Sequence, residues 1–597
     1  MHNFGKIELN LSRIVAGVAT GLLLAGLACG AAAPATPRPA ATPSPAVAQV
    51  ATPTPAALAQ VATVTPTAKP AATAAPIAAP AVSPGKVTWM IGSFGNERFD
   101  AAFATVAGKD YLTQVHATLI SSDLKEGRKA IIPGIATKWE ISSDGLTWTL
   151  TIRKGVKFHD GTEVTAEDVL WSLRHTIGPQ STDYSVSATS TSWAPIMDRI
   201  EQTGPDRVSV TTKIPASDFP ATFSNVAGSS SGAVYPKRAT LHDVKEEAAY
   251  DRNPIGAGFM RLVKQVPADS MTLERFADYY DQPKNGFPTD KRVNFTLLDL
   301  RLVPEEATRV AALRAGDADI APVTLGARKQ VEAGGGRLVF GQEGAYHFVR
   351  LMGCWKAQFP CRDQRVRQAL NYAINKELMR DRLYGGPEVM QVKGWAFVSP
   401  SSIGYSPDLD PWPFDPVKAR QLLVEAGYPG GKGFGKLVVN TYVSSSLPLM
   451  PEASQLAADF WKRELGLDVE VKVGDAGALL RDFLRNEDLY GTVFWRDNET
   501  KVDGGGSLRS QYGTPTGYNR AHDDPELFAM AKKAQAVFDP GEREKVLNGA
   551  YRRLRDEAYD ILIGYTNLPW GVGPRIRTWE PYPLSFYPSA LHTIILK

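Results

Sequence analysis

The amino-acid sequence predicts a mixed α/β protein with more than one domain. Of its 597 residues, 43% are hydrophobic and 22% are charged, which is typical of a globular chain, and the length exceeds that of most single domains. Beyond the first 85 residues, stretches that alternate apolar and polar side chains are interspersed with stretches of helical periodicity. Because strands and helices that alternate along a chain pack as layers, this order predicts α/β lobes.

The strand prediction is clearest in residues 146–152 (LTWTLTI). Apolar residues alternate strictly there, so Trp148 and its alternate neighbours share one face of a strand. Residues 139–141 (WEI) alternate in the same way. Between them lies Asp144-Gly145, a pair typical of a two-residue hairpin turn in which both residues take positive φ. We therefore expect a β-hairpin with Trp148 in the core.

Four helices are predicted by their end signals. A Thr or Asp side chain caps a helix start, Pro fits the first turn, and Gly ends a helix. Early acidic residues, which suit the helix dipole, follow the first start, and apolar residues at helical spacing follow the other three. The expected limits are Thr165 as the cap of the first helix, Glu305 and Gly316 for the second, Asp363 with an apolar face that reaches Leu378 for the third, and Asp415 and Gly427 for the fourth.

The N-terminus has the pattern of a targeting segment. Basic residues precede residues 14–28, which are apolar or small throughout, and this run is too short for a comfortable membrane span. It ends at Cys29, as in a bacterial lipobox, although Gly26 stands where Leu is usual. We predict a lipoprotein signal peptide over residues 1–29 and acylation of Cys29. A secreted protein and an uncleaved helix are the alternatives.

The composition of residues 30–85 predicts a linker. They consist almost entirely of Ala, Pro, Thr, Val and Ser, and frequent prolines block both helix and sheet. In polyproline form, at about 3.1 Å per residue, such a segment could reach on the order of 150 Å. A long tether suits a folded body that works just outside a membrane.

Charge and cysteine content narrow the partners. Lys and Arg total 66 against 63 Asp and Glu, so the net charge of +3 gives no reason to expect nucleic acid. Cys354 and Cys361 lie close in sequence, and outside the cytoplasm a disulfide between them is the natural interpretation, with two free thiols as the alternative. The eight histidines are scattered without a ligand spacing, so we expect no metal site and no cofactor.

Several motifs resemble, in order, one known family. They are residues 133–140 (PGIATKWE), 143–150 (SDGLTWTL), 153–162 (RKGVKFHDGT), 165–169 (TAEDV), 253–258 (NPIGAG), 312–320 (ALRAGDADI), 363–374 (DQRVRQALNYAI) and 419–430, which ends EAGYPG. The chain is similar to the family-five extracytoplasmic solute-binding proteins, the peptide and nickel type, over roughly residues 86–597.

The resemblance implies a two-lobed, periplasmic-binding-protein-like (class II) clamp with an extra small subdomain in the first lobe. Ligand is held between the lobes, and closure buries it. The closed clamp would then deliver solute to the permease subunits of an ABC importer. The expected divisions are 86–115 (first lobe), 116–249 (small subdomain), 250–340 (first lobe), 341–569 (second lobe) and 570–597 (return to the first lobe).

The resemblance also suggests where ligand binds. In peptide-binding members an aspartate after a tryptophan in the second lobe pairs with the α-amino group of the ligand, since a buried ammonium needs a charged partner. In the family this aspartate stands three residues after the tryptophan, and this chain has Asn498 at that position. Asp497 lies one position earlier, and Asp503 lies further along the chain. The candidates are Trp495, Arg496, Asp497, Asn498 and Asp503, with Trp395 in the second lobe and Phe94, Asn96 and Arg98 in the first.

Three functions follow as hypotheses. The first is an extracytoplasmic transport receptor for peptides, anchored by lipid to the outer face of the membrane and monomeric. The second is the same receptor serving oligosaccharides or a metal chelate. The third is a secreted hydrolase with paired carboxylates across a cleft. The motifs favour the transport receptor, which is not an enzyme.

Overall fold

The computed structural model describes residues 85–597 apart from 103–107, 124–129, 179–191, 225–229, 240–243, 286, 288–289, 445–446, 448, 486, 514–517 and 586. All of these residues lie in one unit of the chain, Ile77–Lys597. The predicted signal peptide, the linker and Cys29 lie outside them. No helix in the described part of the chain combines the length and the apolar character that crossing a bilayer requires.

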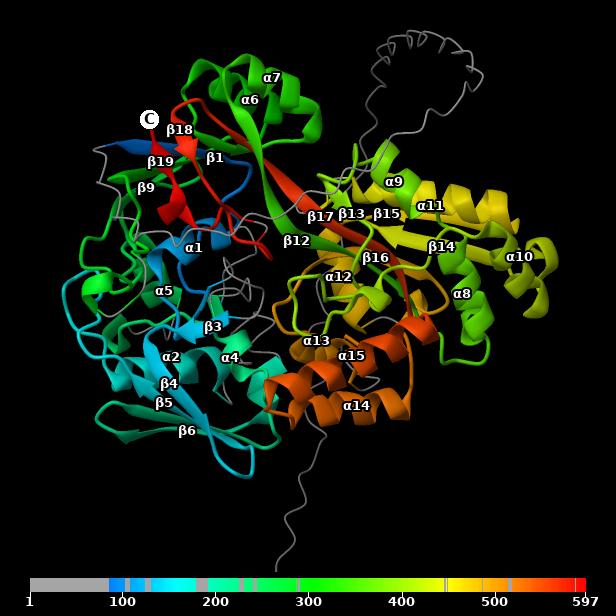
Figure 1. Ribbon diagram of the computed structural model, residues 1–597, viewed down its shortest axis with the longest axis horizontal. Coiled ribbons are helices and arrows are strands. Elements are labelled where there is room, and N and C mark those ends of the chain that lie inside the picture. The colour runs from blue at the N-terminus through cyan, green and yellow to red at the C-terminus, as the bar shows by residue number, and fades with distance from the viewer. Residues whose placement is uncertain are drawn as a thin grey trace, which may run out of the picture. The chain divides into compact units, whose positions relative to one another are not determined.

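One large sheet organises the described residues (Figure 1). Its strands follow the order β15-β14-β16-β12-β17-β11-β1-β10-β9-β8, and β13 pairs with β17 beside this path. The strands are β1 (Lys86–Ile91), β8 (Met260–Val266), β9 (Ser270–Arg275), β10 (Leu297–Leu302), β11 (Ile320–Pro322), β12 (Arg337–Leu351), β13 (Met390–Gln391), β14 (Lys436–Thr441), β15 (Asp468–Val473), β16 (Val493–Glu499) and β17 (Asp560–Val572).

The pairing directions divide this sheet into two α/β groups. Strand β1 is parallel to β10 and β11, and β14 is parallel to β15 and β16. Parallel neighbours need crossover connections, and helices α6 (Glu306–Ala315) and α11 (Met450–Leu465) supply them. The long antiparallel strands β12 and β17 join the two groups. We call residues 85–340 with 570–597 the first lobe, and 341–569 the second lobe.

A separate antiparallel sheet forms the small subdomain with helix α2 (Ala166–Ile177). Its strands, in spatial order, are β4 (Ala136–Ile141), β5 (Thr147–Ile152), β7 (Arg207–Thr212) and β6 (Met197–Gly204). The predicted hairpin is present, and Trp148 is buried on β5. The two-residue turn was wrong, because the loop runs from 142 to 146 and only Gly145 has positive φ, at 73°. The carboxylate of Asp144 instead accepts hydrogen bonds from the hydroxyl of Ser142 and the backbone N–H of Leu146, which closes a wider loop.

Three of the four helix predictions are confirmed. Thr165 caps α2 (Ala166–Ile177), α6 ends at Gly316 with φ of 81°, and Asp415 caps α10 (Pro416–Glu425). The third helix begins after its predicted cap as α8 (Gln364–Tyr372) but does not continue to Leu378.

A separate helix, α9 (Lys376–Arg382), carries Leu378. Asn375 caps α9 by accepting a hydrogen bond from the backbone N–H of Leu378, and this cap interrupts the apolar pattern. The predicted buried position was therefore wrong, since Leu378 is 40% exposed.

The remaining elements are short or lie around these sheets. They are α1 (Lys109–Val115), β2 (Ile120–Asp123), β3 (Ala130–Pro133), β4 (Ala136–Ile141), β5 (Thr147–Ile152), β6 (Met197–Gly204), β7 (Arg207–Thr212), α4 (Phe219–Thr222), α5 (Val244–Arg252), α7 (Arg328–Ala333), α12 (Ala476–Arg485), α13 (Gly504–Tyr512), α14 (Pro525–Gln535), α15 (Pro540–Glu557), β18 (Ile576–Thr578) and β19 (Ile595–Leu596).

Separate clusters of buried hydrophobic side chains form the cores of the lobes and of the small subdomain. One cluster consists of buried side chains between residues 345 and 565, and another of side chains between 117 and 280. A third joins the beginning of the first lobe to the chain's end: Trp89 contacts Trp570 with ring centroids 6.1 Å apart. Packing of this kind holds the C-terminal segment on the first lobe. The division boundaries given above stay predictions.

A disulfide joins Cys354 to Cys361 in the structure, with Cα atoms 5.0 Å apart. Both residues belong to the hydrophobic cluster of the second lobe. The bridge closes the loop between β12 and α8.

Candidate ligand-binding site

Trp495 lies on β16, in the core of the second lobe. Its side chain is fully buried, and its indole N–H donates to Nδ1 of His347 at 3.2 Å. Burial lowers the pKa of His347 to about 3, so the ring is neutral. Because Nδ1 accepts, the proton resides on Nε2, which lies 3.0 Å from the hydroxyl of Tyr384. This chain of hydrogen bonds fixes β16 against β12.

Asp497 lies on the same face of β16, two residues further along. It is half-buried, and it accepts hydrogen bonds from the hydroxyls of Tyr442 at 2.6 Å and Ser444 at 2.8 Å. Burial, together with the charge of Asp497, raises the pKa of Tyr442, so the phenol keeps its proton and donates. Hydroxyl donors orient this carboxylate near the end of the strand.

Arg496 and Asn498 point to the other face of the strand. The guanidinium of Arg496 lies over the rings of Phe483 and Phe348, at 5.1 and 5.5 Å from their centroids. The amide oxygen of Asn498 accepts from the backbone N–H of Glu499 at 2.9 Å. The tryptophan and the aspartate therefore share a face, whereas the arginine and the asparagine do not join them.

Asp503 is engaged within the second lobe. One carboxylate oxygen caps α13 by accepting from the backbone N–H of Gly505 at 2.6 Å. The same side chain forms an ion pair with Arg543 at 2.7 Å, and both side chains are only 6% exposed. Arg543 thus neutralises this carboxylate inside the protein.

The other predicted residues lie apart from β16. Trp395 is buried in the second lobe, and its indole N–H has no hydrogen-bond partner among the described residues. In the first lobe, Phe94 packs in the core and Arg98 pairs with Asp251 at 2.6 Å, whereas Asn96 is exposed. Among the described residues, no group of three or more His, Cys, Asp or Glu side chains is placed to hold a metal ion.

An ion pair connects the two lobes at the end of β16. Lys109, at the start of α1, contacts Glu499, which also pairs with Lys501 at 2.9 Å. Burial alone would raise the pKa of Glu499, but the charges of Lys109 and Lys501 lower it to about 2. Neighbouring Asp110 behaves oppositely, because its burial outweighs the charge of Lys109 and raises its pKa to about 8.

A second contact joins the small subdomain to the second lobe. Arg509 pairs with Asp218 at 3.1 Å, with side chains that are 12% and 3% exposed. Beside it, the backbone N–H of Ser217 donates to the carbonyl of Gln535 at 3.0 Å, and Arg543 donates to the hydroxyl of Ser217. Apolar contacts accompany these polar ones, since Phe538 of the second lobe packs against Trp148 of the small subdomain with ring centroids 5.7 Å apart.

We call β12 and β17, which run from one lobe to the other, the crossing strands. One residue of β12 has a strained backbone conformation where these strands pass between the lobes. Glu343 lies in an irregular part of β12 with φ of 55°, a left-handed conformation that costs energy outside glycine. Its carboxylate accepts from the backbone and hydroxyl of Ser401, each at 2.9 Å, and its own N–H donates to the Asn567 side chain on β17 at 2.9 Å. These contacts on both sides hold Glu343 in this conformation, where the pairing of β12 with β17 is irregular.

Sequence analysis missed the groups that bring the lobes together. Lys109 and Glu499 are 390 residues apart in the chain, and Asp218 is similarly remote from Arg509. Glu499 directly follows the predicted residues on β16, so the charge at the strand end was the one local signal available. Nothing local singled out Lys109.

Comparison with known proteins places the chain in a family. Residues 130–517 match the "Bacterial extracellular solute-binding proteins, family 5 Middle". The chain is 31% identical over 348 residues to a glutathione-binding protein, GsiB, of Pectobacterium atrosepticum, an alignment that covers 58% of this chain and 62% of the relative.

Two solved structures show the same fold. The substrate-binding protein CtaP of Listeria monocytogenes has a TM-score of 0.70 at 21% identity, covering 86% of this chain and 99% of that one. The periplasmic binding protein DppA of Helicobacter pylori, in complex with peptide STSA, has a TM-score of 0.67 at 22% identity, covering 86% and 98%. With these matches and a two-lobed α/β fold joined by two crossing strands, the chain belongs to the family-5 bacterial extracellular solute-binding proteins, the solute receptors of ABC importers, and is not an enzyme.

Proposed function

We propose that the solute is a peptide and that Asp497 binds its α-ammonium group. A buried ammonium needs an oriented carboxylate, since the desolvation cost otherwise cancels the binding. The half-buried Asp497, oriented by the hydroxyls of Tyr442 and Ser444, supports this role. Asp503 is the weaker candidate because Arg543 already neutralises it.

Trp395 is the second contact that we propose. Its buried indole N–H has no partner in the described part of the chain, and an unsatisfied buried donor costs about 1–3 kcal/mol. A carbonyl oxygen of a peptide would satisfy this donor. The other residues on β16 that we propose to lie beside the ligand are Trp495, Arg496 and Asn498. In the first lobe they are Phe94, Asn96 and Arg98.

Similar proteins support a peptide ligand. One relative is a glutathione-binding protein, and one structural neighbour is in complex with a peptide. Glutathione is itself a tripeptide with a free α-amino group, so both ligands offer an ammonium to a carboxylate. The proposal carries this chemistry over to Asp497.

Titration of the purified protein with peptide, oligosaccharide and nickel-chelate libraries tests the ligand class. Asp497→Asn should weaken peptide binding by roughly hundreds-fold, since an unpaired buried charge costs about 3–5 kcal/mol. The matched control Asp459→Asn changes an exposed aspartate and should bind normally. Peptide affinity unchanged in Asp497→Asn would remove the residue's role. Binding of sugars or chelates alone would replace the peptide proposal.

We also propose that Cys29 carries a lipid that anchors a monomeric receptor to the outer face of the membrane. The apolar run before Cys29 and the long Pro-rich linker after it support this arrangement. Cells fed a labelled fatty acid should label the wild type and not Cys29→Ala, which should leave the membrane fraction or remain unprocessed. An unlabelled wild type would contradict the anchor.

A further inference from the structure

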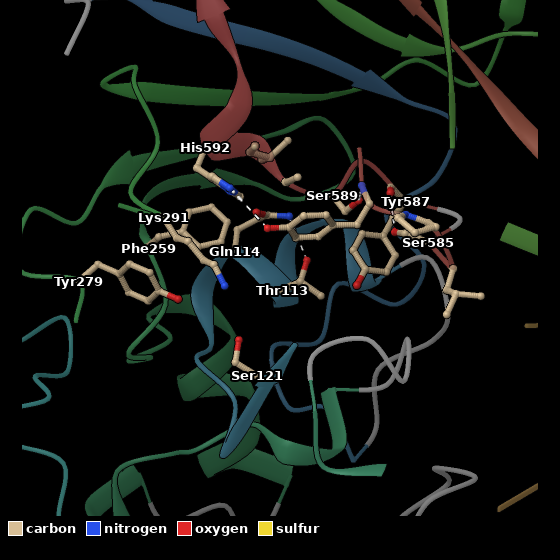
Figure 2. Close-up of a pocket in the computed structure, with 15 residues that line it drawn as sticks. Thr113, Gln114, Ser121, Phe259, Tyr279, Lys291, Ser585, Tyr587, Ser589 and His592 are labelled. Carbon is tan, nitrogen blue, oxygen red and sulfur yellow. Dashed lines mark hydrogen bonds between the residues drawn. The ribbon is translucent and has the colours of Figure 1, made fainter. Parts of the chain in front are cut away.

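A cavity of about 90 Å³ lies in the first lobe between α1 and the C-terminal segment (Figure 2). A water molecule occupies roughly 10–15 Å³ on this measure, so there is room for roughly six to nine waters or one small ligand. The lining residues are Thr113, Gln114, Ser121, Phe259, Tyr279, Lys291, Tyr582, Pro583, Leu584, Ser585, Tyr587, Ser589, Ala590, Leu591 and His592.

Gln114 presents an unsatisfied acceptor at this cavity. The side chain is 2% exposed, and its amide nitrogen donates to the hydroxyl of Thr113 at 2.9 Å. Its buried Oε1 has no hydrogen-bond partner among the described residues. Because a buried acceptor without a partner is destabilising, a donor supplied by a ligand would stabilise the folded protein.

The cavity wall is close to electrically neutral. Lys291 is the one Lys, Arg, Asp or Glu among the lining residues that the structure describes. Its ammonium lies 3.5 Å from a carboxylate oxygen of Asp281, whose side chain is 1% exposed. Since burying an uncompensated charge is costly, this neutral pair favours an uncharged ligand over an ion.

The rest of the wall combines aromatic faces with hydroxyl groups. Phe259 and Tyr279 contact each other with centroids 5.8 Å apart, and Figure 2 shows Tyr279, Ser121 and Thr113 around the same space. Polyols and sugars present C–H faces that pack on aromatic rings, and hydroxyls that both donate and accept. Such a compound could therefore donate to the amide oxygen of Gln114 while it packs against the aromatic and hydroxyl side chains of the wall.

We propose that this cavity binds a neutral polyhydroxy compound no larger than a monosaccharide. The lining residues that the structure describes all belong to the first lobe, including its small subdomain. We therefore expect the ligand to need no contact from the second lobe, where Val502 packs in one cluster with Leu584 of this wall. Asp497 is not among the lining residues, and we expect this site and the peptide site to be occupied independently.

Titration of the full-length protein with glycerol, xylitol, glucose and myo-inositol tests the proposal. Melting temperature and heat are both measured. We expect at least one compound to bind saturably at millimolar or lower concentration and to raise the melting temperature. Gln114→Met should weaken that binding at least tenfold. The control Gln421→Met alters an exposed glutamine of the second lobe and should bind as the wild type does.

Polyols at high concentration stabilise many proteins by exclusion from their surface, without saturation. An equal, unsaturated effect of all four compounds on wild type and Gln114→Met would overturn the proposal. If Gln114→Met does not fold, Ser121→Ala provides the same comparison on a second lining residue. Asp497→Asn should leave polyol binding intact, and its loss there would assign the compound to the interlobe site instead. Failure of peptide binding would leave this result unaffected.

Discussion

The ion pair between Lys109 and Glu499 should control how readily the lobes separate. The two side chains are 12% and 20% exposed, between the surface and buried regimes. At an effective dielectric constant of about 20, unit charges 4 Å apart attract by about 4 kcal/mol, part of which desolvation offsets. In Lys109→Met, Glu499 keeps Lys501 as a partner at 2.9 Å. We therefore expect a loss of about 1–2 kcal/mol of closure free energy.

The reciprocal change should be more severe. Glu499→Gln leaves Lys109 and Lys501 facing each other without the carboxylate, a loss of about 3–5 kcal/mol. At 1.4 kcal/mol per factor of ten, the closed-to-open ratio falls roughly 5- to 30-fold in Lys109→Met and by more than a hundredfold in Glu499→Gln. Small-angle X-ray scattering of the unliganded protein should therefore report a radius of gyration that rises from the wild type to Lys109→Met and again to Glu499→Gln.

Lys436→Met is the matched control. Lys436 pairs with Glu470 at 3.5 Å within the second lobe, where both side chains are about half exposed, and such pairs contribute about 0–1 kcal/mol. Its scattering should equal that of the wild type. If Glu499→Gln also scattered like the wild type, the ion pair would not hold the lobes, and the reasoning would be refuted.

Three further predictions concern stability. Replacing Cys354 and Cys361 by Ser should lower the free energy of unfolding by about 2–3 kcal/mol in urea, since the bridge closes a short loop; full alkylation of both thiols in unreduced protein would disprove the bridge. Asp503→Asn should cost about 3–5 kcal/mol because Arg543 becomes a buried unpaired charge, and a cost below 1 kcal/mol would contradict this. For Asp110, the pKa of about 8 in the folded protein lies above the unfolded value, so its contribution to the free energy of unfolding is full below about pH 4 and is lost as pH rises towards 8. Urea titrations between pH 4 and 8 should therefore show a shallower decline of the free energy of unfolding in Asp110→Asn than in the wild type. Parallel declines would refute the raised pKa.

Local signals predicted the secondary structure best. Thr165 and Asp415 cap helices because capping depends on a few neighbouring residues, which the sequence displays directly. The same locality explains the failure at Leu378, where a second cap at Asn375 interrupts a periodicity that otherwise continues. At Asp144, side-chain hydrogen bonds produced a wider loop than the dipeptide alone suggests.

The site was harder to predict than the fold. Trp495 and Asp497 were found from a motif, and their alternation on β16 does place them on one face. Their partners could not be found, because His347 and Tyr442 come from other strands or loops. Contacts across the sheet depend on pairing register, which a single sequence does not reveal.

The identity of the bound solute tests the central claim most directly. Protein purified under native conditions from its own cells should be measured intact by mass spectrometry, then denatured so that the released ligand can be sequenced. The account predicts one peptide per protein molecule, with a free α-amino group, and a much smaller bound fraction in Asp497→Asn. Release of a sugar or a metal chelate in place of peptide, with equal occupancy in the variant, would contradict it.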